Sequence, residues 1–311
     1  MPQSATMPPV LIAVDWGSSS FRAYLMAPNA EILDEVASGD GIGSVAAGAY
    51  PATLKRLIGR WLEAYPSLSV VASGMVGSRH GWREAAYVKC PAGPREVAAQ
   101  LTQVEADGRR VQLAAGLSYV DEAAQPDVMR GEETEIFGIA EAGARLIVLP
   151  GSHSKWAKVD GDYVVAFKTF VTGELFAAVR DHTIVGAFAR AAPAKSPGEP
   201  SALGVRRGAA AGACEGKSGL LGLMFGARSL PLMVALSESD AGEYLSGLLI
   251  GAEIGEARRL FPGETPYVAG AEALVERYLA AFAALDVSAR AAPRRAAARG
   301  LFRIARDGGL L

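Results

Sequence analysis

The sequence is poor in cysteine and has no long apolar run. Its two cysteines among 311 residues, Cys90 and Cys214, are too few for a disulfide framework, and their spacing matches no zinc-ligand pattern. The N-terminus lacks a basic region before its apolar residues, and no apolar run approaches the roughly 20 residues that span a bilayer. We therefore expect a cytoplasmic protein that is neither secreted nor inserted in a membrane.

An excess of charge of either sign is also lacking. The formal net charge is −2, 21% of the residues are charged and 50% are hydrophobic, as in an ordinary globular protein. Nucleic acids and membrane surfaces are therefore not expected as partners, and the oligomeric state, a homo-oligomer included, stays open. The chain is longer than one hydrophobic core usually supports, which predicts two domains with a cleft between them.

The N-terminal part predicts a β-meander followed by a helix and a strand. Two apolar strands join at a turn that contains Gly17, and a strand of alternating character follows. The helix carries Pro51 near its start and apolar residues at helical spacing, which predicts an amphipathic helix. The expected elements are strands at 10–14, 21–26 and 30–38, a helix at 49–65 and a strand at 68–74.

A second cycle of the same kind begins near residue 144. The strand at 145–151 is continuously apolar, as in a strand covered on both faces, and a hairpin around Asp160 and Gly161 follows it. This succession suggests a structural duplication without a sequence repeat, so we divide the chain into lobes 1–143 and 144–311. Helices are expected at 131–144, 173–188, 219–230, 241–260 and 271–285, with a strand at 265–270 and a loop at 191–200.

Two polar turns follow apolar strands in corresponding places. One contains Asp15, Gly17 and serines, and the other runs from Gly151 to Lys155. Backbone N–H groups and hydroxyls of such turns can hold a phosphate, while the acid holds hydrated Mg²⁺ beside it. An ordinary polar β-turn is the alternative for either turn alone. Their recurrence favours two loops that hold the two ends of a triphosphate.

Several segments of the chain together resemble one family. They are DWGS, ASGMVGSRHGW, DVMRGEETEIFG, PGSHSK, TGELF, LSGLLIGAEIGEA and VAGAEAL. The chain is similar, from about residue 10 to its end, to the bacterial 2-dehydro-3-deoxygalactonokinases, in the superfamily that joins sugar kinases to actin. The resemblance implies an α/β chain of two ribonuclease-H-like lobes that close on ATP and Mg²⁺ in an interlobe cleft. It also implies phosphorylation of the 6-hydroxyl of 2-dehydro-3-deoxy-D-galactonate in galactonate catabolism.

The resemblance further implies a set of nucleotide-binding residues. Lys155 is either a phosphate contact or a solvated hairpin lysine, and glycerol and xylulose kinases usually carry Gly-Thr-Gly where this chain has Ser152 and His153. The turn at Thr172, Gly173 and Glu174 resembles one that supports the nucleotide in those kinases, and the turn at Gly270 and Ala271 resembles their adenosine-binding turn. The phosphate loops so implied are Asp15, Gly17, Ser18 and Ser19, with Asp15 also at the metal, and Gly151, Ser152, His153 and Ser154.

The catalytic acid is expected at the start of the helix near residue 131. In the glycerol and xylulose kinases a Gly-Asp pair opens a helix, and its Asp accepts the proton from the sugar hydroxyl. Glu132 stands at the position of this Asp. Because Glu is one methylene longer than Asp, the register could shift so that Glu133 takes the role, or Asp127 upstream could take it. The ordinary explanation is that Glu132, Glu133 and Glu135 only complement the helix dipole, at about 0.3 to 1 kcal/mol each.

The carboxylate of a sugar acid requires a cationic partner, and the planar guanidinium of arginine can bind both of its oxygens. The loop after the strand at 68–74 supplies such groups where xylulose kinases place a sugar-contacting loop. Taken singly, His80 is more simply explained as a surface histidine and Trp82 as a packing aromatic residue. Arg22 and Arg130 are weaker candidates, because an arginine beside an acid is often only an ion pair. The candidates in this loop are Arg79, His80, Trp82 and Arg83.

Three local patterns resemble other nucleotide-binding or sugar-acid sites. Residues 211–218 satisfy a loose P-loop pattern but follow no buried strand. Residues 41–46 match a dinucleotide fingerprint, although the strand before them alternates in polarity. The segment VAGAEA lacks the second Gly and the Asp of the anion hole in ribokinase-like kinases. None of these three patterns is favoured.

Two functional alternatives stay open. The substrate could be another sugar or sugar acid, such as the gluconate epimer, because one hydroxyl's orientation cannot be read from the sequence. The chain could also be a non-catalytic sugar-acid sensor on the same scaffold. The arginines of residues 289–306 imitate a nucleic-acid patch, but a solvated helix face fits the small net charge better.

Overall fold

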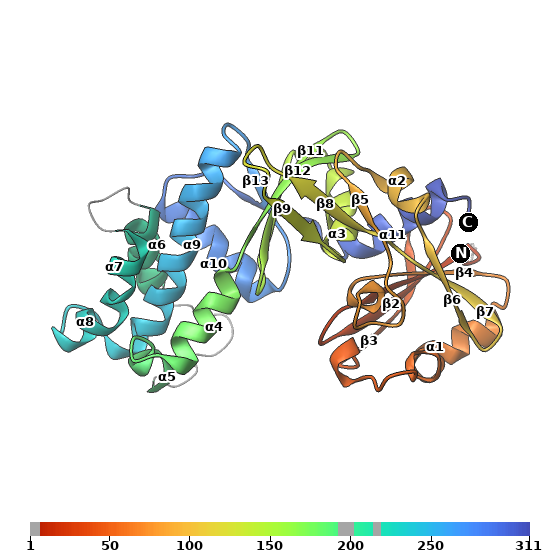
Figure 1. Cartoon of the computed structure of the whole chain (residues 1–311), viewed down its shortest axis with the longest axis horizontal. Helices are drawn as coiled ribbons and strands as arrows, with labels where there is room; N and C mark the ends of the chain where they lie inside the picture. Colours follow the sequence, from red (N-terminus) through yellow and green to blue (C-terminus); the bar gives the residue numbers. More distant parts are fainter. Residues whose placement is uncertain (1–6, 192–201, 214–218) are drawn as a thin grey trace, which may run out of the picture. The chain divides into compact units, whose positions relative to one another are not determined.

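The structure is a computed structural model that describes residues 7–191, 202–213 and 219–311 (Figure 1). Its contacts divide the chain into two compact units. The first comprises residues 1–143, 159–166 and 294–311, and the second comprises 144–158 and 167–293. The lobes expected from the sequence place everything after residue 143 in the second of them. The C-terminal segment instead belongs to the first unit, because its helix buries an apolar face there.

The first unit is built on a six-stranded mixed sheet in the order β3-β2-β1-β4-β7-β6. The central strand β1 pairs antiparallel with β2 and parallel with β4, so the polar residue at its carboxyl end lies beside the end of β4. The predicted meander and fourth strand are therefore confirmed. The strands are β1 (Leu11–Trp16), β2 (Phe21–Met26), β3 (Ile32–Ser38), β4 (Ser69–Ser73), β6 (Thr102–Ala106) and β7 (Arg109–Leu113).

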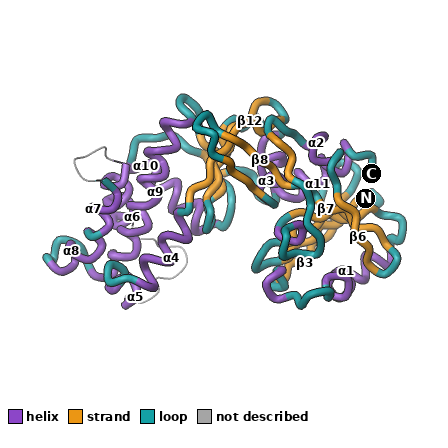
Figure 2. The backbone as a smooth tube through the Cα atoms, viewed as in Figure 1, coloured by secondary structure: helices purple, strands orange, loops and turns teal. Residues whose placement is uncertain are grey.

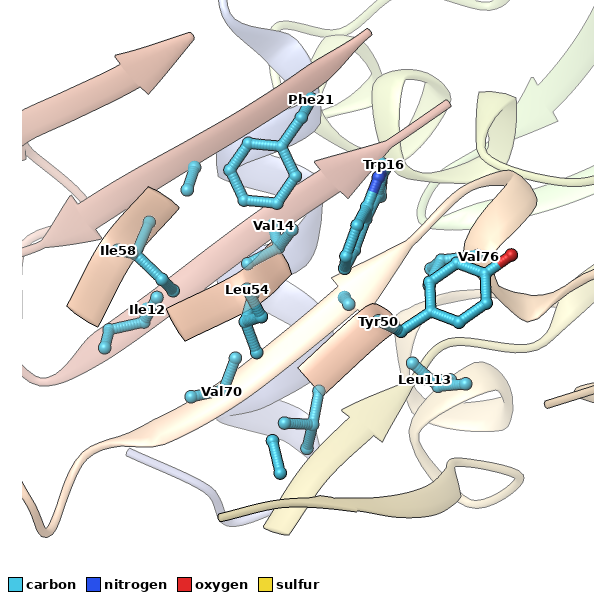
Figure 3. Packing of buried hydrophobic residues seen from close by; sticks show 14 of the residues in the cluster. Ile12, Val14, Trp16, Phe21, Tyr50, Leu54, Ile58, Val70, Val76 and Leu113 are labelled. Carbon is cyan, nitrogen blue, oxygen red and sulfur yellow. The ribbon is translucent and has the colours of Figure 1, made fainter. Parts of the chain in front are cut away.

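The predicted amphipathic helix, α1 (Tyr50–Ala64), packs on this sheet. Figure 3 shows Leu54 and Ile58 of α1 beside Ile12, Val14 and Trp16 of β1, all fully or almost fully buried. The last helix, α11 (Ala296–Asp307), packs against β1, β4 and α3 (Glu132–Ala140). Burial of apolar area in these contacts, at about 25 cal/mol per Å², is the main stabilising contribution to the unit.

The arginine-rich C-terminal segment differs from the expectation. Arg303 of α11 is only 4% exposed, donates from Nη1 to the backbone oxygen of Phe137 at 2.7 Å and pairs with Asp162. The prediction of a solvated arginine face is therefore wrong for Arg303. A buried guanidinium has to find acceptors, and here they come from α3 and from the hairpin residue Asp162.

Residues 85–129 contain elements that the sequence pattern does not indicate. A separate three-stranded sheet has the order β5-β8-β9, and β9 leads directly into α3. These strands have three to five residues each, too few for a clear periodicity in the sequence. The elements are β5 (Tyr87–Lys89), α2 (Pro94–Ala98), β8 (Gly116–Val120) and β9 (Pro126–Met129).

The second unit repeats the arrangement of the first. Its sheet has the order β12-β11-β10-β13-β14, with β10 antiparallel to β11 and parallel to β13, just as β1 is to β2 and β4. The predicted structural duplication is therefore confirmed. The strands are β10 (Leu146–Leu149), β11 (Ser154–Asp160), β12 (Tyr163–Phe170), β13 (Pro266–Val268) and β14 (Arg290–Ala291).

Helices make up the rest of the second unit (Figure 2). The long helix α9 contacts α4, α6 and α10, and its backbone lies directly against α6: a Cβ on Gly251 would come within 2.2 Å of the Ala209 oxygen. Across 7–191, 202–213 and 219–311, none of the helices combines the length and apolarity that crossing a bilayer requires. The helices are α4 (Thr172–His182), α5 (Ala187–Ala191), α6 (Ala202–Ala213), α7 (Leu220–Met224), α8 (Gly226–Leu232), α9 (Ala241–Leu260) and α10 (Glu272–Ala284).

Two sequence predictions fall on positions that the structure leaves out. The loop expected at 191–200 lies outside the described residues from 192 onward, and so does the end of the P-loop-like segment from 214 onward. The residues before that segment form α6, not the buried strand that a P-loop requires.

Candidate active site

The turn between β1 and β2 is held by backbone hydrogen bonds. The Gly17 N–H donates to the Ser20 oxygen at 2.9 Å, and the side chains of Ser18 and Ser19 are exposed. The Ile42 N–H donates to the Gly17 oxygen at 3.0 Å, and a Cβ on Gly41 would lie 2.4 Å from the Ser18 oxygen. The glycine-rich segment 41–46 therefore packs directly against this turn. The close packing explains the glycines of the segment, so a dinucleotide-binding role is not needed to explain them.

Asp15 lies at the carboxyl end of β1, next to this turn. Its side chain is 22% exposed, and its Oδ2 lies 3.9 Å from Nη1 of Arg22, its partner across the β1–β2 ladder. Burial raises the pKa of Asp15, the positive charge of Arg22 opposes this rise, and the negative charge of Glu132 adds to it. A cation bound beside Asp15 would reduce the repulsion between the carboxylates of Asp15 and Glu132.

Glycine contacts bring the start of α3 to the ends of β1 and β4. Gly74 follows β4 with φ of +95°, and a Cβ there would lie 2.7 Å from the Trp16 oxygen. Gly131 precedes α3 with φ of +103°, and its Cβ would lie 3.0 Å from the Gly74 Cα. Only glycine adopts these conformations without strain and permits such close approach. The three backbone segments therefore meet at one place.

The first acids of α3 accept hydrogen bonds from the backbone just before the helix. Glu132 Oε2 accepts a hydrogen bond from the Arg130 N–H at 3.0 Å, and Glu133 Oε2 accepts one from the Gly131 N–H at 2.6 Å. Glu133 is fully buried, and its Oε1 has no hydrogen-bond partner within the described ranges. Burial, helped by the negative charge of Glu132, raises the pKa of Glu133 to about 8. Glu133 is thus protonated near neutral pH.

Glu135 belongs to the same cluster of acids. Burial raises its pKa to about 7, and the negative charges of Asp15 and Glu132 contribute to the rise. The sequence indicates Glu135 only as a group that complements the helix dipole. The sequence shows that Glu135 lies at helical spacing from Glu132. Its proximity to Asp15 depends instead on the packing of α3 beside β1.

The three candidates for the catalytic acid differ in position. Glu132 is the one whose charge acts on Asp15, whereas Glu133 is enclosed in the interior. Asp127 lies on β9 and accepts the Val128 N–H at 2.8 Å. Of the three, Glu132 is therefore the one within electrostatic reach of Asp15, and its catalytic role stays a prediction.

The residues predicted to bind the sugar acid make divergent contacts. Arg79 is 80% exposed, with Nε 3.7 Å from Glu84, while Arg83 donates to the Gln103 oxygen on β6 at 3.1 Å. Trp82 stacks on Tyr50 at 6.0 Å and packs on the core, which is the role of a packing aromatic. His80 is exposed, and its backbone oxygen accepts the Tyr50 hydroxyl at 3.2 Å.

Arg130 is buried between β9 and α3. Its Nη2 donates to the Ala85 oxygen at 2.7 Å, and its guanidinium lies 4.3 Å from the centre of the Tyr87 ring. Its Nε and Nη1 have no hydrogen-bond partner in the part of the chain that the structure describes. These contacts attach the start of α3 to the segment that follows the loop of Arg79 to Arg83.

In the second unit, three predicted nucleotide-binding segments meet at the carboxyl ends of β10 and β13. The Glu174 N–H donates to the Ser152 oxygen at 3.0 Å, and a Cβ on Gly173 would lie 2.3 Å from the Gly151 oxygen. His153 Nε2 lies 2.6 Å from Glu174 Oε2. The turn before α10 joins them, because a Cβ on Gly270 would lie 3.5 Å from the Pro150 oxygen, and Ala271 follows as the N-cap of α10.

The end of the second turn is buried. Ser154 Oγ lies 2.8 Å from the Tyr278 hydroxyl. Lys155 is only 5% exposed, and its Nζ donates to the His153 oxygen at 3.5 Å. The alternative of a solvated hairpin lysine is therefore wrong for Lys155.

A cavity of about 460 Å³ lies elsewhere in this unit, lined by α6, α9 and Leu285 and by none of the predicted nucleotide residues.

These features define a class of protein. The five strands of the second sheet follow the same order as five of the six strands of the first, and in both sheets a polar turn joins the first two antiparallel strands. This is the α/β arrangement of the sugar kinase and actin-like ATPase fold. A family model for 2-keto-3-deoxy-galactonokinase matches residues 15–304. The chain therefore belongs to the 2-keto-3-deoxy-galactonokinase family.

Individual relatives agree with this family. The 2-dehydro-3-deoxygalactonokinase of Escherichia coli (strain K12) is 34% identical over 283 residues, which cover 89% of this chain and 91% of the relative. A protein of Rhizobium meliloti (strain 1021) named as a probable 2-dehydro-3-deoxygalactonokinase is 35% identical over 248 residues, 79% of each chain. A crystal structure under the same kinase name from Sinorhizobium meliloti superposes with a TM-score of 0.82 at 33% identity and covers 95% of this chain and 98% of its own.

Proposed function

We propose that the protein transfers the γ-phosphoryl group of ATP to the 6-hydroxyl of 2-dehydro-3-deoxy-D-galactonate, with Mg²⁺, in galactonate catabolism in the cytoplasm. One observation carries the proposal: close glycine contacts join the end of β1, which carries Asp15, to the end of β4 and to the start of α3, which carries Glu132. Phosphoryl transfer needs positioned phosphates, charge neutralisation and a group that orients the attacking hydroxyl. The first unit supplies candidates for all three.

Asp15 is the residue that would hold Mg²⁺. Within the described residues, no group of three or more His, Cys, Asp or Glu side chains forms a metal-ligand cluster. Mg²⁺ is commonly held by one or two carboxylates together with substrate phosphates and water, so a single Asp beside a phosphate-binding turn fits this ion. When bound, Mg²⁺ neutralises the charge of the transferred phosphoryl group.

Glu132 is our candidate for the group that accepts the proton of the sugar hydroxyl. Its Oε2 is oriented by the Arg130 N–H, and its position at the start of α3 is set by the glycine contact with the end of β4. General bases of this kind contribute about 10² to 10⁴ in rate. Glu133 is less suited, because a carboxyl group with a pKa of about 8 is protonated at neutral pH.

The other predicted residues take roles in binding. We assign the carboxylate of the sugar acid to the loop of Arg79, His80, Trp82 and Arg83, with Arg79 as the group best able to reach a ligand because it is 80% exposed. We assign the nucleotide to the clustered turns of the second unit. These turns contain Gly151 to Lys155, Thr172 to Glu174, and Gly270 with Ala271.

A coupled assay of ADP release, run across a panel of keto-deoxy sugar acids, tests the function. We expect ADP release to depend on 2-dehydro-3-deoxy-D-galactonate, with a lower kcat/KM for the gluconate epimer, and the product to carry its phosphate on C6 by ³¹P–¹H NMR. Equal or better turnover with the gluconate epimer would reassign the substrate. Binding of the sugar acid without any turnover would make the protein a sensor and overturn the proposal.

A further inference from the structure

We propose that Glu253 of α9 is a positioning residue that holds two nucleotide-binding turns of the second unit in their ATP-binding arrangement. Glu253 is only 3% exposed, and it lies in the sequence block LSGLLIGAEIGEA, to which no role has been assigned. The inference rests on the proposed function, since it concerns how this chain binds ATP.

The carboxylate of Glu253 receives hydrogen bonds from several elements at once. Its Oε1 accepts from Trp156 Nε1 at 2.7 Å, and its Oε2 accepts from the Tyr278 hydroxyl at 2.7 Å. Oε2 also accepts from Thr172 Oγ1, and Ser154 Oγ lies 2.8 Å from the same Tyr278 hydroxyl, so Ser154 joins the network through Tyr278. The donors thus come from β11, from the first residue of α4 and from α10, all converging on one residue of α9.

Two residues of this network, Thr172 and Ser154, belong to the turns assigned to the nucleotide. Ser154 ends the turn that contains Ser152 and His153, and Thr172 begins the turn of Gly173 and Glu174. The exposed parts of the two turns also contact each other, through His153 and Glu174. Glu253 therefore connects the two turns on their buried side, whereas His153 and Glu174 connect them on their exposed side.

A role in stability alone explains this arrangement poorly. Burial raises the pKa of Glu253, while the hydrogen bonds from Thr172, Trp156 and Tyr278 lower it. A buried carboxylate costs free energy even when it is well bonded, and apolar side chains of similar volume often replace such groups without loss of stability. Buried residues that orient binding groups do affect affinity, because they set the geometry of the groups that touch the ligand.

The variant Glu253→Gln tests the proposal, because glutamine has nearly the same shape but cannot accept hydrogen bonds from all of these donors. Glu256→Gln is the matched control, since Glu256 lies one turn further along α9 and is exposed. We expect Glu253→Gln to raise the Kd for ATP, measured by calorimetry, and the KM for ATP by about tenfold or more. The KM for the sugar acid should change little, and Glu256→Gln should match the wild type.

A second variant keeps the test informative if Glu253→Gln folds poorly. Thr172→Val removes one donor and should also weaken ATP binding, and in Glu253→Gln/Thr172→Val the two effects should not add, because both act through one network. Unchanged ATP affinity in folded Glu253→Gln, or an equal rise of both KM values, would overturn the positioning role. If the wild type itself binds no ATP, the proposed function fails first, and the inference fails with it.

Discussion

Gly131 packs so closely on Gly74 that a Cβ added to Gly131 would lie 3.0 Å from the Gly74 Cα. This contact sets the start of α3 against the end of β4, and the Cβ of an alanine at position 74 would come within 2.7 Å of the Trp16 oxygen. The proposed catalytic carboxylates, Asp15 and Glu132, therefore depend on two glycines that carry no functional group.

Gly74→Ala should lower kcat by about tenfold or more and lower the free energy of unfolding by about 1 to 3 kcal/mol, because alanine is strained at φ of +95°. Steady-state kinetics and thermal unfolding measure the two effects. Gly39→Ala is the control, since within the described part of the chain no atom would lie within 4 Å of a Cβ on Gly39. Wild-type kcat in Gly74→Ala would show that the register of α3 and β4 does not matter for transfer.

Glu132→Gln should lower kcat by about 10² to 10⁴ and leave the Kd for ATP unchanged, because the amide cannot take the proton from the sugar hydroxyl. Rapid-mix turnover and calorimetry separate the two quantities. Glu141→Gln, an exposed glutamate that follows the same helix, should behave as the wild type. If Glu132→Gln turns over normally, the role moves to Asp127 or Glu133.

Glu133→Gln should become more stable relative to the wild type as the pH rises from about 4.5 to about 8. The folded-state pKa of Glu133 is raised to about 8, so over this range the folded chain binds more protons than the unfolded chain. The stability of the wild type then falls with rising pH, by at most about 1.4 kcal/mol per pH unit from this group. The glutamine variant lacks this loss and keeps a carbonyl oxygen for the Gly131 N–H.

Thermal unfolding of both proteins at several pH values measures this difference. The variant should gain little below pH 4.5, where the carboxyl group is protonated in both states of the wild type. Glu135, whose pKa is raised to about 7, gives the wild type and the variant the same additional dependence. Parallel stability curves across the range would contradict a protonated Glu133.

Gly173→Ala should raise the KM for ATP by about tenfold, because its Cβ would lie 2.3 Å from the Gly151 oxygen and push the two turns apart. Gly219→Ala serves as the control in the same unit, since no atom of the described residues lies within 4 Å of a Cβ there. An effect on the sugar-acid KM alone would remove these turns from the nucleotide site.

Arg79→Ala should raise the KM for the sugar acid by about tenfold or more and leave the KM for ATP unchanged, because a charged partner of the substrate carboxylate is lost. Its ion pair with Glu84 is exposed and contributes little to stability. Arg110→Ala, an exposed arginine on β7, is the control. If only the KM for ATP rises, the loop does not bind the substrate carboxylate.

Features that depend on residues close to one another in the sequence could be predicted from the sequence alone. The strands around Gly17, the helix at Tyr50–Ala64 and the hairpin at Asp160–Gly161 all appear where periodicity and turn residues indicated them. The acidic start of α3 was predicted for the same reason. The short strands between residues 85 and 129 were not, because three to five residues carry too little pattern.

The sequence by itself determined the longer strands and helices, the polar turns at Asp15 and Ser152, and the family resemblance. Only the tertiary structure decided which side chains meet: Thr172 and Glu253 are 81 residues apart in the chain, and Arg303 and Phe137 are 166 apart. The proximity of Asp15 to Glu132 and Glu135 likewise arises from glycine contacts between separate segments. Local patterns encode local conformation, whereas contacts between distant segments depend on how whole elements pack, and no single stretch of the sequence specifies that.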